Sequence, residues 1–205
     1  EGIQPTDEMI NKNLAAINYR HIQLNTEEHS VRFKKQGVRI DLGGIAKGYA
    51  VDNGIEILRK CGAEYGLVTA GGDSRILGDK KGRPWMMAIQ HPRNKKEVAV
   101  VLPLSNAAIS TSGDYERYFI KDGQRIHHII NPGTGKSADK SWSATVIADD
   151  ALTSDALSTT LFVLGAEKGL ELINKLEAID AVIIDSSGNM HYSSGLLAPD
   201  KQSMN

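Results

Sequence analysis

The segment 41–52 combines glycines, a lysine and carboxylates in an order that suits the binding of an anion. Its sequence, Asp-Leu-Gly-Gly-Ile-Ala-Lys-Gly-Tyr-Ala-Val-Asp, places Gly43 and Gly44 just before a predicted helix. The glycines allow close approach to the backbone, and the start of a helix offers unpaired N–H groups at the positive end of its dipole. The segment therefore predicts a phosphate-binding turn.

Lys47 falls on the apolar side of the helix predicted over 46–60. A lysine is unfavourable there, because burial removes its hydration and its charge opposes the helix dipole at the first turn. An anionic partner would explain this placement. The alternative is that the side chain extends past the helix end into solvent.

A second polar group lies at the front of the helix predicted over 150–164. Asp155 and Thr159 are four residues apart, so they share a helix face, and Ser158 is adjacent. A carboxylate with neutral oxygens suits Mg²⁺, which binds few protein oxygens together with substrate phosphates. The alternative is a capping array, since Ser, Thr and Asp are common where helices begin.

Two further segments could supply polar contacts. His127 and His128 are adjacent in a predicted strand, where side chains alternate, so they do not form a chelating pair. We expect one at the surface, while the other could act as a general base or phosphate contact; a structural role is the alternative. Residues 110–115 are predicted as a hydroxyl-rich turn that could donate to phosphate or ribose oxygens, although such residues are common in turns.

The composition limits the classes of function. The chain has 205 residues, of which 40% are hydrophobic and 24% charged, as expected for a globular protein with one substantial core. No apolar run approaches the length of a membrane span, so we expect a chain that is not membrane-spanning. A net charge of -1, with three Phe and two Trp, predicts no nucleic-acid partner.

The elements that must position these residues follow from periodicity. Strands outnumber helices and short turns join most of them, which predicts an α+β fold with a mixed, mainly antiparallel sheet and helices packed on its outer faces. A dinucleotide-binding fold is disfavoured, because no G-x-G-x-x-G motif follows a strand. Helices are predicted over 6–17, 46–60, 150–164 and 167–176. Strands are predicted over 21–24, 30–34, 38–40, 65–69, 85–90, 98–102, 107–110, 115–120, 125–130, 143–148, 181–184 and 190–192.

In this order, the segments resemble the ApbE family of flavin transferases, also called FAD:protein FMN transferases. The resemblance rests on segment 41–52, Gly-Gly-Asp at 71–73, Thr-Ser-Gly at 111–113, His-Ile-Ile-Asn-Pro-Gly-Thr-Gly at 128–135, and Ser-Asp-Ala-Leu-Ser-Thr-Thr-Leu-Phe-Val-Leu-Gly at 154–165. It predicts one ApbE-like domain over 1–205, equivalent to the C-terminal portion of the family's length. Family members usually carry an N-terminal segment that helps to form the flavin pocket, and this chain is expected to begin beyond it.

The resemblance implies an enzyme that binds FAD with Mg²⁺, cleaves its pyrophosphate and joins FMN through a phosphoester to a threonine of an acceptor flavoprotein, releasing AMP. His128 is expected as flavin contact or as base for the threonine, and Asp155 as the second catalytic residue. The implied ligands of Mg²⁺ are Gly44 through its carbonyl, Asp155 and Thr159. The implied FAD-binding residues are Asp41, Lys47, Gly72, Asp73, Ser112 and His128.

Several alternatives stay open at this point. The same residues could serve a Mg²⁺-dependent FAD pyrophosphatase that yields FMN and AMP, or a non-catalytic flavin-binding module. Asn131 stands where the family commonly has Asp, which affects any carboxylate-assisted orientation of that turn. Family members work mostly outside the cytoplasm, so the resemblance implies a periplasmic or membrane-tethered extracytoplasmic location.

Overall fold

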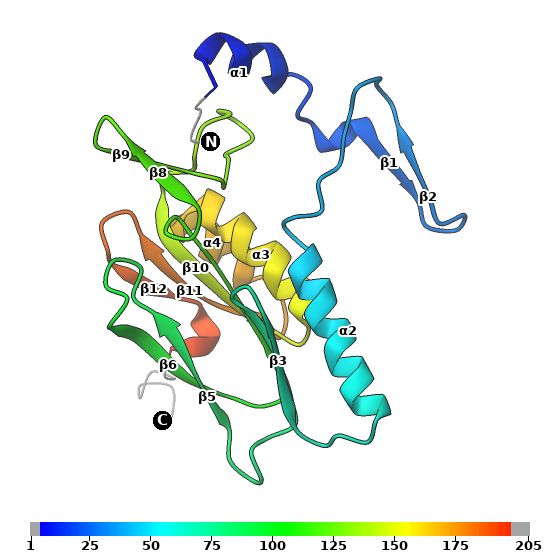
Figure 1. Cartoon of the computed structure of the whole chain (residues 1–205), viewed down its shortest axis with the longest axis vertical. Helices are drawn as coiled ribbons and strands as arrows, with labels where there is room; N and C mark the ends of the chain where they lie inside the picture. Colours follow the sequence, from blue (N-terminus) through cyan, green and yellow to red (C-terminus); the bar gives the residue numbers. More distant parts are fainter. Residues whose placement is uncertain (1–4, 198–205) are drawn as a thin grey trace, which may run out of the picture.

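The computed structural model describes residues 5–197, and its centre is a six-stranded sheet (Figure 1). In spatial order its strands are β12 (Met190–Tyr192), β11 (Asp180–Asp185), β10 (Ser141–Ala148), β7 (Ala108–Gly113), β4 (Asp73–Leu77) and β3 (Gly66–Ala70). Every neighbouring pair in this sheet is antiparallel. The predicted α+β class is confirmed.

One face of the sheet packs against the helices α2 (Ala46–Lys60), α3 (Ala151–Leu164) and α4 (Ala166–Ile173). Alternation along β10 directs Ala144 and Val146 toward this face, where they meet Leu161 and Phe162 of α3. All four are fully buried. Burial of each large apolar side chain contributes about 1.5–3 kcal/mol, so this layer fixes α3 on the sheet.

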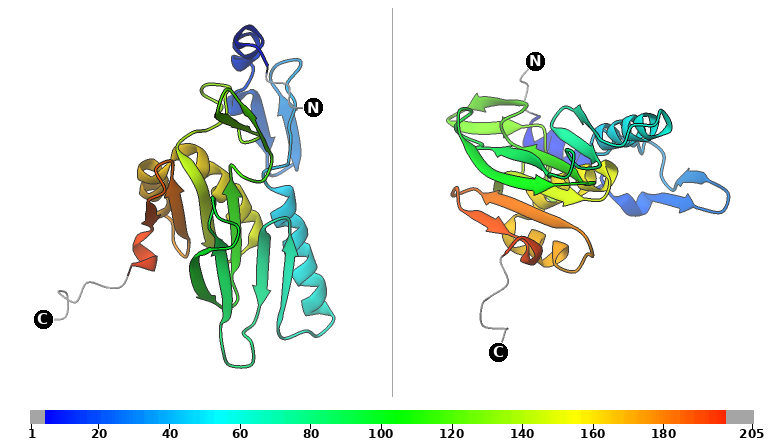
Figure 2. Two further views of the ribbon diagram at one scale, coloured as in Figure 1. Left: turned by 60° about the vertical axis from the view of Figure 1, so that its left-hand side comes forward. Right: turned by 90° about the horizontal axis from the view of Figure 1, so that it is seen from below.

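The other face is covered by a hairpin of β5 (Trp85–Gln90) and β6 (Val98–Leu104) rather than by a helix. Ile89 of the hairpin packs on Ile109, Ile147 and Val182, which alternation places opposite the helix-facing residues. Figure 2 shows this hairpin and the helices on opposite sides of the sheet. The main helices therefore share a single face.

The remaining elements lie around these layers. A helix, α1 (Asp7–Leu14), and a hairpin of β1 (Ile22–Asn25) and β2 (Ser30–Phe33) lie apart from the sheet (Figure 1). A second hairpin, β8 (Tyr118–Lys121) and β9 (Gln124–His127), leads into the segment that carries His128. Short 3₁₀ turns occur at η1 (Tyr19–His21) and η2 (Ser194–Leu196).

Three local predictions were wrong. Residues 38–40 are not a strand, because this short run pairs with no other strand in the described chain. Strand β4 was not predicted, since it is covered on both sides and so lacks a polar–apolar alternation. Residues 110–113 are not a turn but the second half of β7, where their hydroxyls face neighbouring elements instead of solvent. Within the described residues, no helix has both the length and the apolarity that a membrane crossing requires.

Candidate functional site

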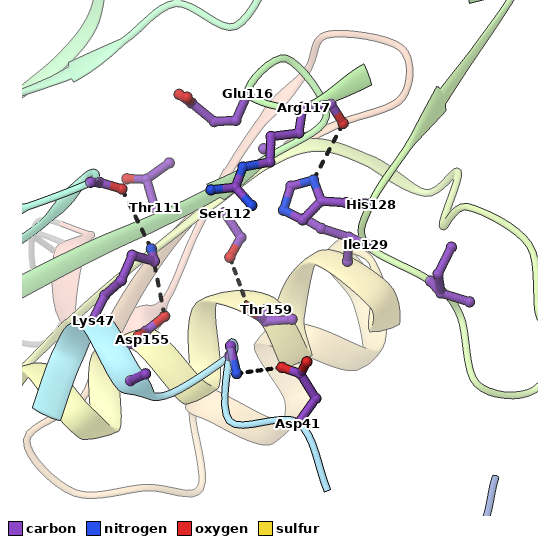
Figure 3. Close-up of a pocket in the computed structure, with 16 residues that line it drawn as sticks. Asp41, Lys47, Thr111, Ser112, Glu116, Arg117, His128, Ile129, Asp155 and Thr159 are labelled. Atoms are coloured by element: carbon purple, nitrogen blue, oxygen red, sulfur yellow. Dashed lines mark hydrogen bonds and ion pairs between the residues drawn. The ribbon is translucent and has the colours of Figure 1, made fainter. Parts of the chain in front are cut away.

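A cavity of about 670 Å³ lies where the start of α2 meets α3, the end of β7 and the segment after β9 (Figure 3). Gly71 also lines it, so the structure brings together residues from five separate parts of the sequence. Of the predicted site residues, those lining the cavity are Asp41, Gly44, Lys47, Ser112, His128, Asp155 and Thr159. Gly72 and Asp73 lie behind this wall, and Asp73 reaches the cavity only through Lys47.

The two helices that form one end of the cavity approach unusually closely at Gly48. A Cβ atom at this position would lie 2.2 Å from the carbonyl oxygen of Ala151, so only glycine fits. The close approach lets Gly48 N–H donate to Asp155 Oδ2 at 2.9 Å. Gly48 of the 41–52 segment is therefore needed for packing, and it also holds the Asp155 carboxylate.

Asp52 anchors the same interface one turn further along α2. Its carboxylate accepts hydrogen bonds from the N–H groups of Ala151 and Leu152, at 2.8 and 2.9 Å, at the start of α3. Arg75 of β4 donates to it at 2.8 Å. A carboxylate at this position satisfies two otherwise unpaired N–H groups and complements the dipole of α3. The last residue of the motif thus fixes α2 against α3.

Lys47 has anionic partners inside the protein. Its Nζ atom is hydrogen-bonded to the buried carboxylate of Asp73 and lies 4.0 Å from Asp155 Oδ1. The Lys47 side chain is still 43% exposed, and Figure 3 shows it directed toward the cavity. Both interpretations of this lysine therefore hold in part, because carboxylates of the protein compensate its charge and part of its side chain is open to solvent.

The Asp155 side chain is only 4% exposed, which has an electrostatic consequence. Burial raises the pKa of Asp155, and the carboxylate of Asp73 raises it further, while the Gly48 N–H and the Lys47 ammonium act in the opposite direction. A cation bound beside Asp155 would favour the ionised form by direct attraction. A bound cation would therefore offset part of the unfavourable free energy of burying the ionised Asp155 carboxylate.

The two histidines face opposite ways, as the alternation predicts. His127 is buried, and its ring lies edge-on to Phe162. Its Nε2–H donates to the carbonyl oxygen of Ala138 at 2.8 Å, and burial lowers the pKa of His127. His128 is exposed and lines the cavity, with Nδ1 3.4 Å from the carbonyl oxygen of Arg117.

Glu116 and Arg117 also line the cavity, and the sequence reasoning did not identify them. Figure 3 shows the Arg117 side chain between Glu116 and His128. Arg117 forms no salt bridge with any residue in the described range 5–197. The only available signal was a Glu-Arg pair just after the Ser-Gly segment, which the periodicity assigned to a strand over 115–120.

The turns that carry the other predicted residues are closed by side chains. Asp41 Oδ1 accepts a hydrogen bond from Gly43 N–H at 2.6 Å, which shapes the turn before α2. Asn131 Oδ1 accepts from Gly133 N–H at 2.9 Å in the turn after His128. An amide oxygen can replace a carboxylate oxygen in this contact, so the local turn forms with Asn131 in place of Asp.

Most of the chain matches a known protein family. The ApbE family model matches residues 1–183. The chain belongs to the ApbE family. A FAD:protein FMN transferase of Haemophilus influenzae is 39% identical over 178 residues, which cover 84% of this chain and 51% of that relative. A FAD:protein FMN transferase of Escherichia coli K12 is 34% identical over 190 residues, which cover 90% of this chain and 54% of that relative.

Solved structures of ApbE proteins share the fold. The crystal structure of an ApbE protein from Thermotoga maritima has a TM-score of 0.85 and 39% identity, and the match covers 94% of this chain and 63% of that one. The flavin transferase ApbE from Vibrio cholerae has a TM-score of 0.81 and 30% identity, covering 95% and 62%. The chain thus spans about half the length of the curated ApbE relatives and somewhat more of the solved structures.

The cavity of this ApbE chain offers oxygen atoms that fit a hard cation. Asp155 and Thr159 lie one turn apart on α3, and both line the cavity together with Gly44. The described residues contain no cluster of three or more His, Cys, Asp or Glu side chains that could hold a metal. A cation here would therefore combine one carboxylate with neutral oxygens and a ligand's own phosphates, as Mg²⁺ does.

Proposed function

We propose that this chain carries the FAD- and Mg²⁺-binding site of a FAD:protein FMN transferase, which joins FMN to a threonine of an acceptor flavoprotein and releases AMP. The ApbE relatives named above support the reaction. The observation that carries the proposal is that one cavity gathers a lysine, an arginine, a histidine and the oxygen set of Asp155 and Thr159.

The charges of the cavity support a role for a divalent cation. Its acidic lining residues are Asp41, Glu116 and Asp155, and its basic lining residues are Lys47 and Arg117. Lys47 is already paired with Asp73. A pyrophosphate brings further negative charge, so the protein's own cations do not balance the complex. When bound, Mg²⁺ would neutralise phosphate oxygens and polarise the phosphorus toward attack.

The proposed step is a substitution at the phosphorus atom of the FMN half of FAD. A threonine oxygen of the acceptor forms the new P–O bond, and the bond from that phosphorus to the bridging oxygen breaks. The bridging oxygen leaves with AMP, and the hydroxyl proton of the threonine passes to a base. Lys47 and Arg117 would stabilise charge on the nonbridging and leaving oxygens.

His128 is the proposed base. Its Nδ1 lies near the carbonyl oxygen of Arg117, which can only accept, so the proton of a neutral ring resides on Nδ1. Its Nε2 then carries the lone pair. Because His128 is exposed at the cavity wall, this nitrogen is accessible to an incoming hydroxyl group.

The test is to incubate this chain with FAD, Mg²⁺ and a threonine-bearing acceptor subunit, and to measure the mass of the acceptor and the release of AMP. A matched acceptor in which the target threonine is replaced by valine serves as the control. We expect an FMN-sized mass gain on the first acceptor alone. Free FMN and AMP without any adduct would instead identify water as the nucleophile and a pyrophosphatase. FAD binding without turnover would identify a binding module.

The extracytoplasmic location implied by the family resemblance stays a proposal. It is supported by the family relationship alone, and fractionation of cells that express the full-length protein would test it. Recovery of the protein with the cytoplasmic fraction would exclude it.

A further inference from the structure

The hydroxyl groups between α3 and β7 form two pairs with the same chemistry, one buried and one partly buried. Ser110 and Ser112 lie two residues apart on β7, so both face α3. Ser154 and Ser158 lie four residues apart on α3, so both face β7. Ser110 Oγ lies 2.7 Å from Ser154 Oγ, and Ser112 Oγ lies 2.9 Å from Ser158 Oγ.

The second pair differs from the first because it continues to Thr159. Ser112 Oγ also lies 3.0 Å from Thr159 Oγ1. Ser158 Oγ lies 2.9 Å from the carbonyl oxygen of Asp155. A carbonyl oxygen can only accept, so the single hydroxyl proton of Ser158 is used in that bond.

The bond that Ser158 donates to Asp155 fixes which hydroxyl is the donor in the Ser112–Ser158 and Ser112–Thr159 hydrogen bonds. Ser158 must accept from Ser112, because its own proton is already donated to the Asp155 carbonyl. Ser112 has then used its proton and must accept from Thr159. The Thr159 proton therefore points to Ser112, away from the cavity, and the free acceptor capacity of Thr159 Oγ1 is directed to the cavity side.

We propose that Ser158 and Ser112 are positioning residues that orient the Thr159 hydroxyl as an acceptor for a divalent cation in the cavity. The inference rests on the cation site of the proposed function. Ser158 is buried and does not line the cavity, so its hydroxyl reaches Thr159 through Ser112. Ser112 thus gains a role beyond the FAD contact predicted from the sequence.

The test is a titration of the whole chain with Mn²⁺, in which the free ion is measured by electron paramagnetic resonance. We expect Ser112→Ala to weaken Mn²⁺ binding about tenfold, as is typical when a partner of a metal ligand is removed. Ser158→Ala should weaken it in the same direction. Ser112→Thr keeps a hydroxyl and should restore binding.

Ser154→Ala is the matched control, because it removes an equally buried hydroxyl from the same helix face without touching the path to Thr159. It should bind Mn²⁺ as the unchanged chain does, even if its melting temperature falls as much as that of Ser158→Ala. If Ser158→Ala does not fold, the Ser112→Ala and Ser112→Thr pair decides. Equal Mn²⁺ affinity in Ser112→Ala and the control would overturn the positioning role alone. Failure of the unchanged chain to bind Mn²⁺ would overturn both this role and the proposed cation site.

Discussion

Gly48 and Asp155 connect the two walls of the cavity through one hydrogen bond, with 2.9 Å between Gly48 N and Asp155 Oδ2. One wall carries Lys47, next to Gly48 in α2, and the other carries Thr159, one turn beyond Asp155 in α3. A shift of either helix would change the distance between the cation-binding oxygens and the lysine. The helix contact is therefore part of the site.

Gly48→Ala should destabilise the protein by about 3 kcal/mol, because the added methyl group would collide with the backbone of α3 and overpack a rigid contact. The nearest atom, the Ala151 carbonyl oxygen, would be 2.2 Å away. Urea unfolding measures the effect. Gly44→Ala is the matched control for stability, since a Cβ atom there meets nothing within 4 Å. Equal free energies of unfolding for the two variants would contradict the close approach.

Asp52→Ala should lower the free energy of unfolding by about 2 kcal/mol, because α3 loses two N-terminal partners and Arg75 loses its carboxylate. Glu56→Ala, on the same helix, removes an exposed ion pair with Arg59 and should change stability by less than about 0.5 kcal/mol. Thermal and urea unfolding of both variants check the difference. A cost for Glu56→Ala as large as that for Asp52→Ala would show that Asp52 is not a specific anchor.

Arg117→Gln should weaken FAD binding about tenfold, because a charged hydrogen bond to phosphate is lost. Arg83→Gln, at an exposed arginine outside the cavity, is the control and should bind FAD as the unchanged chain does. Flavin fluorescence titration in the presence of Mg²⁺ measures both affinities. Unchanged FAD affinity in Arg117→Gln would remove this residue from the ligand site.

Stability should fall in mild acid through His127. Burial lowers the pKa of His127 in the folded chain below its ordinary value of 6.5. The unfolded chain therefore binds the proton more readily, so the contribution of His127 is present above pH 6.5 and is lost as the pH falls below that value. Protonation at Nδ1 would also remove the acceptor of Ile129 N–H.

His127→Gln removes this titration and provides the comparison. The free energy of unfolding of the unchanged chain should decrease more steeply between pH 7.5 and 5 than that of the variant, because carboxylates that titrate in acid are common to both. Parallel pH profiles for the two proteins would mean that His127 does not titrate differently on folding.

The sequence singled out residues that the structure gathers in one cavity, but it did not give all of their local structure. Asp41 and Lys47 lie around the start of α2, Asp155 and Thr159 lie one turn apart within α3, and the structure brings all four to one cavity. Their functional roles stay predictions. The fold class followed from the many short strands joined by turns, and the structure confirms it.

What could not be predicted depends on contacts between distant segments. The Ser110–Gly113 region reads as a turn because hydroxyls and glycine are typical of turns, yet these hydroxyls bond to α3 and β10. The partner of Lys47 is Asp73, whose distance in sequence gives no pairing signal. Arg117 follows β7 by a short loop, and the β8–β9 hairpin brings His128 back beside it, where His128 N–H donates to the Arg117 carbonyl oxygen.

The most direct test of the account is a crystal structure of this chain with FAD and Mn²⁺, using the anomalous signal of manganese to locate the ion. We predict an anomalous peak in the cavity within about 2.3 Å of oxygen atoms of Asp155 and Thr159, with the FAD pyrophosphate between the ion and Lys47. FAD bound in the cavity without a manganese peak at these residues, or manganese bound elsewhere, would contradict the proposed site.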